Sequence, residues 1–390
     1  MIFQGFRIGI PKEIMSGEKR VSATPETTRK MVEEGAVVLV ETGAGSGAHF
    51  TDDDYREAGA SIIDDVEQIF AQVDMILKVK EPLYSEPKGK HEIDMMKSGQ
   101  YLITFIHPAS PSNHQMVRNL AAQGVTSLSL DSLPRISRVQ DMDALTSMST
   151  VAGYKAVLLA SNRLGKFMRM VETAVGFLPP AKVLVIGMGV AGLQALATAK
   201  GLGAMVYAAD IRKEAVEHAR SLAASIVPLN IPDEVAVGHG GYARRLPAEW
   251  LEKEREDLKE IVSSVDMIIL CALVPGKLAP VVITEEMVKS MKNGSVIVDV
   301  SIDQGGNCSC TKPGEVITTH GVSIDGTKNI PSMLPESSTW MFANNIYNFA
   351  SFVAESSRGK LNTSDEIISS ALVTFEGKIV HAGALEAMNT

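Results

Sequence analysis

Short apolar runs alternate with longer amphipathic segments along the chain. In the N-terminal third of the chain, each apolar run is followed by a segment whose apolar residues recur at helical spacing, which favours strands joined by helices. This rhythm predicts a parallel sheet with helices on its faces. The predicted strands are Phe6–Ile10, Val37–Glu41, Met75–Val79, Tyr101–Ile106 and Thr126–Leu130, and the predicted helices are Glu26–Glu34, Asp53–Ala58, Val66–Ala71 and Asn113–Gln123.

A second set of strands follows Pro179-Pro180, so the pattern predicts a second α/β domain. A long helix over Ser147–Met170 joins the two sets, and a strong helical pattern over Ser338–Glu355 is expected to return to the first domain. We therefore expect a discontinuous domain of residues 1–134 plus 330–390 and a second domain of residues 146–325. The strands of the second set are Val183–Ile186, Met205–Ala209, Met267–Cys271, Val296–Val300 and Val322–Asp325.

The bulk composition fits two buried cores. Of 390 residues, 45% are hydrophobic and 21% are charged, which is typical of globular domains. The net charge of −9 argues against nucleic acid or an anionic membrane as the main partner. The odd count of cysteines (Cys271, Cys308 and Cys310) lacks metal-ligand spacing with histidine and indicates free thiols without a metal site. The first residues lack a signal-peptide pattern, so we expect a cytoplasmic protein.

One glycine pattern carries specific chemistry. Gly187, Gly189 and Gly192 follow the strand at Val183–Ile186, and Asp210 follows the next strand. In a dinucleotide-binding turn, the first glycine permits a tight turn, the second lets the backbone approach a pyrophosphate, and the third lets the helix pack on the strand. The helix beginning near Val190 would offer its N–H groups to the phosphates. Asp210 would accept hydrogen bonds from the adenosine ribose and repel a 2′-phosphate, which favours NAD(H). The pattern predicts two Rossmann-like domains with the nucleotide in a central cleft.

Four further residues lie at strand ends, or on loops that leave them, where ligands bind in open parallel sheets. Taken singly, each is more commonly a solvated charge or a turn residue. As a set, they suit oxidation of a carbon that bears an amine beside a carboxylate. Arg20 would pair the carboxylate, and Lys80 would transfer a proton if burial lowered its pKa. His107 would donate or accept a proton, and Asp303 would position the amine or a water molecule.

A glycine-rich segment around Tyr242 interrupts the second domain. Gly238, Gly240 and Gly241 lower the cost of hinge conformations, so this segment suits a mobile flap. By composition alone, an ordinary surface loop is the alternative interpretation.

Several motifs resemble the alanine dehydrogenase and transhydrogenase-alpha family in the expected order. The resemblance extends over nearly the whole chain, and the nearer branch is the NAD(H)-binding domain of proton-translocating transhydrogenase. The motifs that carry it are Gly9-Ile10-Pro11-Lys12-Glu13, Pro134-Arg135-Ile136-Ser137-Arg138-Val139-Gln140-Asp141-Met142-Asp143, Leu178-Pro179-Pro180-Ala181, Gly240-Gly241-Tyr242-Ala243, Ala272-Leu273-Val274-Pro275-Gly276-Lys277, Gly305-Gly306-Asn307-Cys308 and Ile379-Val380-His381.

The transhydrogenase resemblance implies which residues hold the nucleotide and which partners assemble. Arg135, Gln140 and Asp143 would hold the nicotinamide during hydride transfer, and Thr146 replaces the serine of the family pattern. The resemblance also implies a homodimer, a membrane-embedded partner subunit and an NADP(H)-binding partner subunit, which would place the chain peripherally at the inner membrane. The further cofactor contacts it implies are Gly241, Tyr242, Ala272 and Leu273.

The alanine dehydrogenase branch implies a different activity. Lys80, His107, Asp303 and Arg20 occupy positions that resemble the catalytic and substrate-binding residues of that branch, whereas a transhydrogenase domain needs no such acid or base. We favour a transhydrogenase alpha subunit, because the longest and most distinctive motifs, Arg135–Asp143 and the segment around Tyr242, resemble that branch. The alternatives are a free-standing NAD-dependent L-amino-acid dehydrogenase and a non-catalytic NAD(H)-binding protein.

Overall fold

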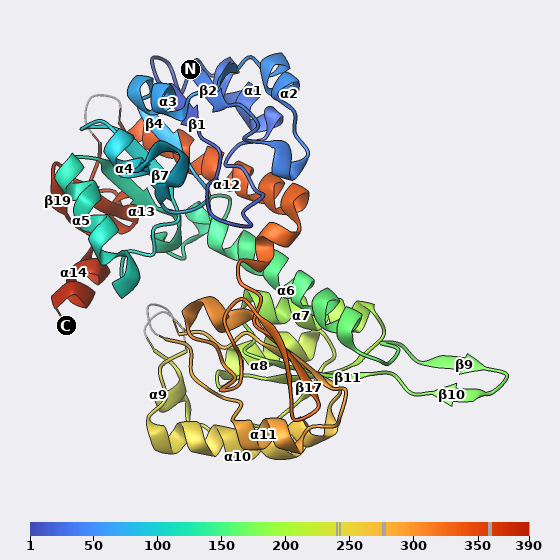
Figure 1. Cartoon of the computed structure of the whole chain (residues 1–390). Coiled ribbons are helices and arrows are strands. Elements are labelled where there is room, and N and C mark those ends of the chain that lie inside the picture. The colour runs from blue at the N-terminus through green and yellow to red at the C-terminus, as the bar shows by residue number, and fades with distance from the viewer. Residues whose placement is uncertain (239–240, 242, 275–277, 358–360, 390) are drawn as a thin grey trace. The chain divides into compact units, whose positions relative to one another are not determined.

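The computed structural model describes residues 1–238, 241, 243–274, 278–357 and 361–389 (Figure 1). The predicted cofactor residue Tyr242 and the motif residues Gly240 and Pro275-Gly276-Lys277 lie outside the described residues. The chain divides into two compact units. Unit 1 consists of Met1–Met148 and Ser332–Thr390, and unit 2 consists of Ser149–Pro331. Each unit contains a mostly parallel sheet, which confirms the predicted α/β fold class.

Unit 1 is built on an eight-stranded sheet in the order β19-β18-β8-β7-β4-β1-β2-β3. The strands from β8 to β3 are parallel, while β18 and β19 pair antiparallel at one edge. The C-terminal segment therefore completes the first sheet. The strands are β1 (Arg7–Ile10), β2 (Val37–Glu41), β3 (Ser61–Ile63), β4 (Met75–Leu77), β7 (Tyr101–Thr104), β8 (Thr126–Ser129), β18 (Leu372–Phe375) and β19 (Lys378–Ile379), and a separate ribbon pairs β5 (Tyr84–Ser85) with β6 (Lys90–His91).

Helices bury both faces of this sheet. On α12, Phe342, Ile346 and Phe349 recur at helical spacing and are fully buried. On α1, Thr24 caps the first turn and Pro25 occupies the first helical position. The helices of unit 1 are α1 (Pro25–Glu33), α2 (Asp52–Glu57), α3 (Val66–Gln72), α4 (Glu92–Met95), α5 (His114–Gln123), α12 (Pro335–Ser356), α13 (Glu366–Ala371) and α14 (Ala382–Asn389).

Unit 2 contains a seven-stranded sheet in the order β13-β12-β11-β14-β15-β17-β16, in which β16 pairs antiparallel at one edge and the other strands are parallel. The strand order reverses between β11 and β14, and ligands bind at the carboxyl edge of such a switch point. The strands are β11 (Lys182–Ile186), β12 (Met205–Ala209), β13 (Ser225–Ile226), β14 (Met267–Leu270), β15 (Val296–Asp299), β16 (Val316–Thr319) and β17 (Val322–Asp325).

Two hydrophobic cores lie on the two faces of this sheet. One contains Ala195 and Leu196 of α7, and the other contains Leu258 and Val262 of α10. The cysteines are free thiols, and Cys271 and Cys308 are buried in these cores. The helices are α6 (Ala144–Arg163), which begins in unit 1, and α7 (Val190–Gly201), α8 (Lys213–Ser221), α9 (Asp233–Ala236), α10 (Ala248–Ser264) and α11 (Glu285–Ser290).

The helix predicted over Ser147–Met170 has different ends in the structure, where α6 spans Ala144–Arg163. It begins earlier because Asp143 accepts a hydrogen bond from the Thr146 amide at 2.8 Å. It ends before Gly165, a residue type that disfavours a helix interior. Beyond it, β9 (Val171–Thr173) and β10 (Gly176–Leu178) form an antiparallel hairpin that extends from unit 2 in Figure 1.

Within the part of the chain that the structure describes, no helix has the length and apolar composition needed to cross a membrane. The same residues contain no cluster of His, Cys, Asp or Glu arranged to hold a metal ion.

Candidate functional site

The glycine-rich turn between β11 and α7 has the geometry of a phosphate loop. Gly187 has φ +90°, and a Cβ there would lie 2.6 Å from the backbone nitrogen of Ala272. A Cβ on Gly192 would lie 1.8 Å from the carbonyl oxygen of Gly187, so only glycine lets α7 pack this closely on the turn. A Cβ on Gly189 would meet no atom within 4 Å, so the space beside it is open. Gly187 and Gly192 thus serve the protein's own packing, whereas Gly189 faces space that a ligand can fill.

The Asp210 carboxylate is bound to this turn. It lies just after β12, is buried, and accepts a hydrogen bond from the Met188 amide at 2.6 Å. It also accepts hydrogen bonds from Arg212 Nε at 3.0 Å and Nη2 at 2.8 Å. The hydrogen bond to Asp210 raises the pKa of Arg212. Arg212 was not predicted, although its position two residues after the acid was visible in the sequence. A ribose that binds Asp210 has to compete with this guanidinium.

A second carboxyl group, on α10, feels the charge of Asp210. The Glu254 side chain lies on the buried face of this helix, one turn before Leu258, and the residue is only 5% exposed. Burial first, and then the negative charge of Asp210, raise the pKa of Glu254 to about 7, against the opposing effect of Arg255. Glu254 is thus partly protonated at neutral pH. The local sequence pattern contained no sign of this, because the surrounding helix is rich in charged residues.

The other predicted cofactor residues of unit 2 are partly accessible. Ala272 follows β14 and lies against Gly187, while Leu273 is exposed beside it. Gly241 is exposed with φ +76°, between Val237 and Ala243, which pair as an isolated bridge. Asp303 lies in a short 3₁₀ helix after β15 and accepts a hydrogen bond from the Asn329 amide at 3.3 Å. Asp303 therefore joins the segment after β15 to the segment after β17.

In unit 1, His107 lies beside a partly buried carboxylate at the carboxyl edge of the sheet. His107 Nδ1 is 3.2 Å from Asp131 Oδ2, and Asp131 Oδ1 accepts hydrogen bonds from the Ile106 amide at 3.1 Å and the His107 amide at 3.2 Å. Burial opposes the charged imidazole, but Asp131 outweighs it and raises the pKa of His107, while the charge of Lys80 lowers it. Lys80 and His107 are thus near enough to interact, and Asp131 is a partner that the sequence analysis missed.

A buried ionic network of Glu13, Lys78 and Glu92 holds the backbone at Lys80. Glu13 Oε1 accepts hydrogen bonds from the amides of Val79 at 2.6 Å and Lys80 at 3.4 Å. Lys78 Nζ lies 3.3 Å from Glu13 and 2.9 Å from Glu92, and all three residues are buried. Burial opposes the ammonium charge, yet the two carboxylates raise the pKa of Lys78. Charged residues inside an apolar strand were the available signal for this network.

Arg20 is not open to solvent. The residue is 3% exposed, and its Nε and Nη2 atoms donate to the two oxygens of Glu18 at 2.8 and 2.6 Å. Its Nη1 atom contacts Met148 Sδ at 2.9 Å. The Nε and Nη2 donors of Arg20 that would bind a substrate carboxylate are therefore already bound to the Glu18 carboxylate.

The segment from Arg135 to Asp143 combines exposed and structural residues. Arg135 and Gln140 are exposed, whereas both oxygens of Asp143 accept hydrogen bonds from Thr146, at 2.8 Å from its amide and 2.7 Å from its hydroxyl. Asn345 of α12 donates to the Asp141 carbonyl at 2.9 Å, which fixes the end of this segment. The structure thus presents two polar side chains beside a fixed helix start.

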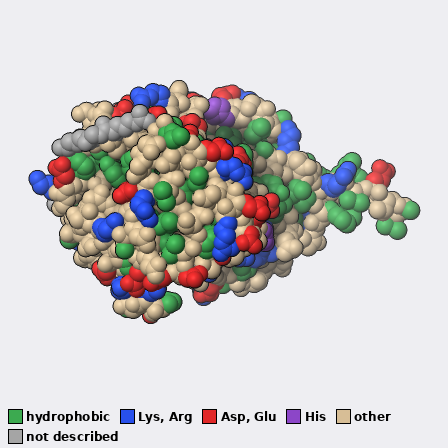
Figure 2. Space-filling view, turned by 90° about the horizontal axis from the view of Figure 1, so that it is seen from above, with side chains coloured by type: hydrophobic (Ala, Val, Ile, Leu, Met, Phe, Trp, Pro, Cys, Tyr) green, Lys and Arg blue, Asp and Glu red, His purple; other side chains and the backbone are tan. Residues whose placement is uncertain are grey.

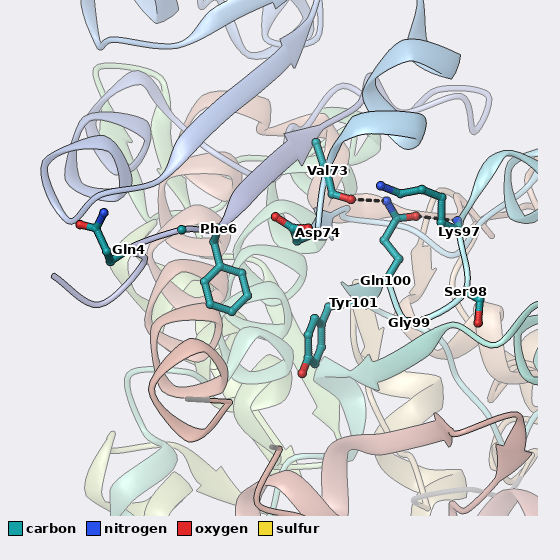
Figure 3. A pocket seen from close by; sticks show the side chains of 10 residues that line it. Gln4, Phe6, Val73, Asp74, Lys97, Ser98, Gly99, Gln100 and Tyr101 are labelled. Atoms are coloured by element: carbon teal, nitrogen blue, oxygen red, sulfur yellow. Dashed lines mark hydrogen bonds between the residues drawn. The ribbon is translucent and has the colours of Figure 1, made fainter. Parts of the chain in front are cut away.

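A surface hollow of unit 1 lies away from these residues. It has a volume of about 410 Å³ and forms at the amino edge of the sheet, where Phe6, Asp74 and Tyr101 lie next to the starts of three strands (Figure 3). The side-chain Nε2 atom of Gln100 donates to the Val73 carbonyl at 2.6 Å, and its Oε1 atom accepts from the backbone amide of Lys97 at 3.0 Å. The side chain of Gln100 is thus paired within the protein, and ligands of parallel sheets bind at the opposite edge.

Comparison with known proteins places this geometry in a family. The family model "Alanine dehydrogenase/PNT, N-terminal domain" matches residues 9–152, and "Alanine dehydrogenase/PNT, C-terminal domain" matches residues 156–382. An NAD(P) transhydrogenase subunit alpha of Rhodospirillum rubrum is 42% identical over 381 residues, covering 96% of this chain and 98% of that protein. "Alanine dehydrogenase 2" of Staphylococcus aureus is 33% identical over 392 residues, covering 98% and 96%.

Solved structures agree with this assignment. A transhydrogenase from Sinorhizobium meliloti has a TM-score of 0.82 at 32% identity, covering 96% of this chain and 99% of that one. An L-alanine dehydrogenase has a TM-score of 0.81 at 29% identity, covering 98% and 99%. The resemblance inferred from the sequence motifs is confirmed. The chain belongs to the alanine dehydrogenase/PNT family of oxidoreductases, and among these relatives it is more similar in sequence to the transhydrogenase alpha subunit than to alanine dehydrogenase.

Proposed function

We propose that the chain is the NAD(H)-binding alpha subunit of an NAD(P) transhydrogenase. In this reaction a hydride, carrying both electrons, leaves C4 of NADH and bonds to C4 of NADP⁺ on a partner subunit, giving NAD⁺ and NADPH. The phosphate loop of unit 2 carries the proposal, because Gly189 faces open space at the switch point while Gly187 and Gly192 are closed by packing. The 42% identity with a transhydrogenase alpha subunit supports the same assignment.

The carboxyl groups near the end of β12 favour NAD(H) over NADP(H). Asp210 would bind the ribose hydroxyls of the adenosine, and its charge also raises the pKa of Glu254. The Asp210 carboxylate would repel a 2′-phosphate. Arg212, which pairs with Asp210, would turn away when the ribose binds.

The exposed residues at the two carboxyl edges suit the remaining contacts. Arg135 and Gln140 are accessible to solvent and would bind the nicotinamide, with Asp143 fixing the start of α6. Ala272 and Leu273, which follow β14, would contact the nicotinamide half. The exposed Gly241 would contact the nucleotide.

The β9–β10 hairpin supports a homodimer. Its apolar side chains are exposed, with Val175 98% and Phe177 59% accessible, and Figure 2 shows hydrophobic side chains on the projecting hairpin among charged and other atoms. An exposed apolar hairpin with open strand edges is a typical association surface. The name "subunit alpha" in the relatives supports further partners, which would be a membrane-embedded subunit and an NADP(H)-binding subunit.

The proposal is tested by binding and by hydride transfer. Calorimetry should detect NADH binding and much weaker NADPH binding. Mixing the chain with an isolated NADP(H)-binding transhydrogenase component should then transfer hydride between the two nucleotides. In Asp210→Asn, NADH affinity should fall by about tenfold or more, because a charged acceptor is lost. Glu217→Ala, which removes an exposed carboxylate that pairs with Arg220, should bind NADH normally. A wild-type chain that does not bind NADH would refute the proposal.

A second function is favoured by the His107–Asp131 pair. A free-standing amino-acid dehydrogenase needs an acid and a base, and His107, with Lys80 near it, has the required chemistry. The filled guanidinium of Arg20 argues against it, because the substrate carboxylate would lose its bidentate partner. With NAD⁺ and L-alanine, we expect no NADH to form. Ammonia-dependent oxidation of NADH by pyruvate would instead establish the dehydrogenase.

A further inference from the structure

Asn307 is a fully buried amide with every hydrogen-bonding group of its side chain in use. Its Oδ1 atom accepts from the Ala272 amide at 2.9 Å. Its Nδ2 atom donates to the carbonyl oxygens of Ala272 and Pro280, both at 2.8 Å. One side chain therefore fixes both backbone polar groups of Ala272 and joins them to Pro280.

Asn307 is itself anchored to the end of β15. Asp299 Oδ2 accepts from the Asn307 amide at 2.8 Å, from the Cys308 amide at 3.0 Å and from the Thr311 hydroxyl at 3.0 Å. Asp299 is fully buried. The hydrogen bonds thus form a continuous support from the last residue of β15, through Asn307, to the residue that begins the loop after β14.

The supported residue lies on one side of the switch point. Ala272 follows β14 and contacts Gly187, whereas Asp210 follows β12 on the other side of β11. In a doubly wound sheet, a dinucleotide lies across the switch point, with the adenosine over one half and the nicotinamide over the other. Ala272 therefore lies on the side opposite to the adenosine acid.

We propose that Asn307 is a positioning residue that holds Ala272 for binding of the nicotinamide half of the dinucleotide. The inference rests on the proposed function and adds a residue to that site. Asn is required by its chemistry, because the position needs one acceptor and two donors in the same plane. An aspartate at this position would offer no donor to the carbonyl oxygens of Ala272 and Pro280, and its negative charge would face both of them.

The test compares whole and half ligands. In Asn307→Asp, calorimetry should show NADH affinity lower by about tenfold to a hundredfold, because two buried acceptors lose their donors. AMP, which contains only the adenosine half, should bind as it does to the wild type. Hydride transfer at saturating NADH should also slow, because the nicotinamide is displaced. Ser295→Ala removes a buried hydroxyl that donates to the Val265 carbonyl at 3.4 Å, before the start of β15, and should leave NADH affinity unchanged.

The two ligands separate a positioning role from a structural one. If NADH and AMP affinities fall together, Asn307 has only a structural role and the inference is wrong; unchanged NADH affinity also refutes it. Should Asn307→Asp fail to fold, Ser301→Ala replaces it. This variant removes the hydroxyl that donates to the Ala272 carbonyl at 3.3 Å and should give a smaller loss confined to NADH. A wild type that binds AMP but not NADH would refute the proposed function itself, and the inference with it.

Discussion

At the scale of single residues, His107 is held in an unusual conformation by its neighbours. Its φ of 49° lies in the left-handed region, which is uncommon for a residue with a side chain. The His107 ring stacks on Phe105 with centroids 5.8 Å apart, and its amide is bound by Asp131. Such strain persists only where the surroundings determine it, and it concentrates at functional sites. The imidazole is therefore fixed at the sheet edge rather than free in a loop.

The His107–Asp131 pair makes stability depend on pH. Because Asp131 raises the pKa of His107 above 6.5, the stabilisation is complete below pH 6.5 and is lost as the pH rises through the raised pKa. The imidazole is 45% exposed, so the effect should be about 1 kcal/mol or less. Urea unfolding across the neutral range should show it in the wild type. His107→Gln should unfold without that pH-dependent part, and NMR titration of an unshifted His107 would contradict the argument.

At the scale of elements, the turn between β11 and α7 separates packing from binding. Gly187 and Gly192 each lie against backbone atoms of the chain, while Gly189 adjoins open space. The requirement for glycine therefore has a different physical cause at different positions of this motif. A substitution at each position should disturb a different property.

Alanine substitutions along α7 test this separation. In Gly192→Ala, the new Cβ would overlap the Gly187 carbonyl. We therefore expect the free energy of unfolding to fall by about 1–3 kcal/mol and NADH binding to be lost as well. Gly189→Ala should retain wild-type stability and lose NADH binding alone. Gly201→Ala, in open space at the end of the same helix, should bind normally and gain up to about 1 kcal/mol. Thermal unfolding and calorimetry measure both properties, and wild-type binding by Gly189→Ala would contradict the assignment.

At the scale of the whole molecule, the hairpin β9–β10 is an element with several exposed apolar side chains. Phe177 and Leu178 on β10 are both exposed. Substituting them with serine should shift a dimer to monomers in sedimentation, while circular dichroism stays unchanged, because the hairpin packs no core. Val316→Ser, an exposed apolar residue on edge strand β16, is the matched control and should remain dimeric. A wild type that sediments as a monomer would refute the homodimer.

Much of the fold followed from local sequence patterns. The predicted strands Val37–Glu41, Met205–Ala209 and Val322–Asp325 have the bounds of β2, β12 and β17. The strand predicted over Tyr101–Ile106 ends at Thr104, because the Ile106 amide donates to the side chains of Ser129 and Asp131 instead of to a backbone carbonyl of the neighbouring strand. The hairpin was missed because its exposed apolar residues follow neither periodicity strictly.

The site residues also fall into those that local sequence patterns predicted and those that depend on distant partners. The glycines of the phosphate loop were readable because their roles depend on spacing within one strand, turn and helix. The roles of Asp131, Glu254 and Asn307 could not be predicted from the sequence, because each interacts with residues 24 or more positions away along the chain. Residue type alone does not specify such partners.

The amino-acid sequence by itself determined the α/β class, the family and the position of the nucleotide-binding turn, because hydrophobic period and glycine spacing are properties of neighbouring residues. Tertiary structure alone decided which charges meet. Folding brought Asp131 onto His107 and gathered Glu13 and Glu92 around Lys78, and so changed what these side chains offer a ligand. The pairs Arg20–Glu18 and Arg212–Asp210, in contrast, join residues only two positions apart. The physical reason is that burial and proximity set the charge and availability of a polar group, and both are fixed only when the chain is packed.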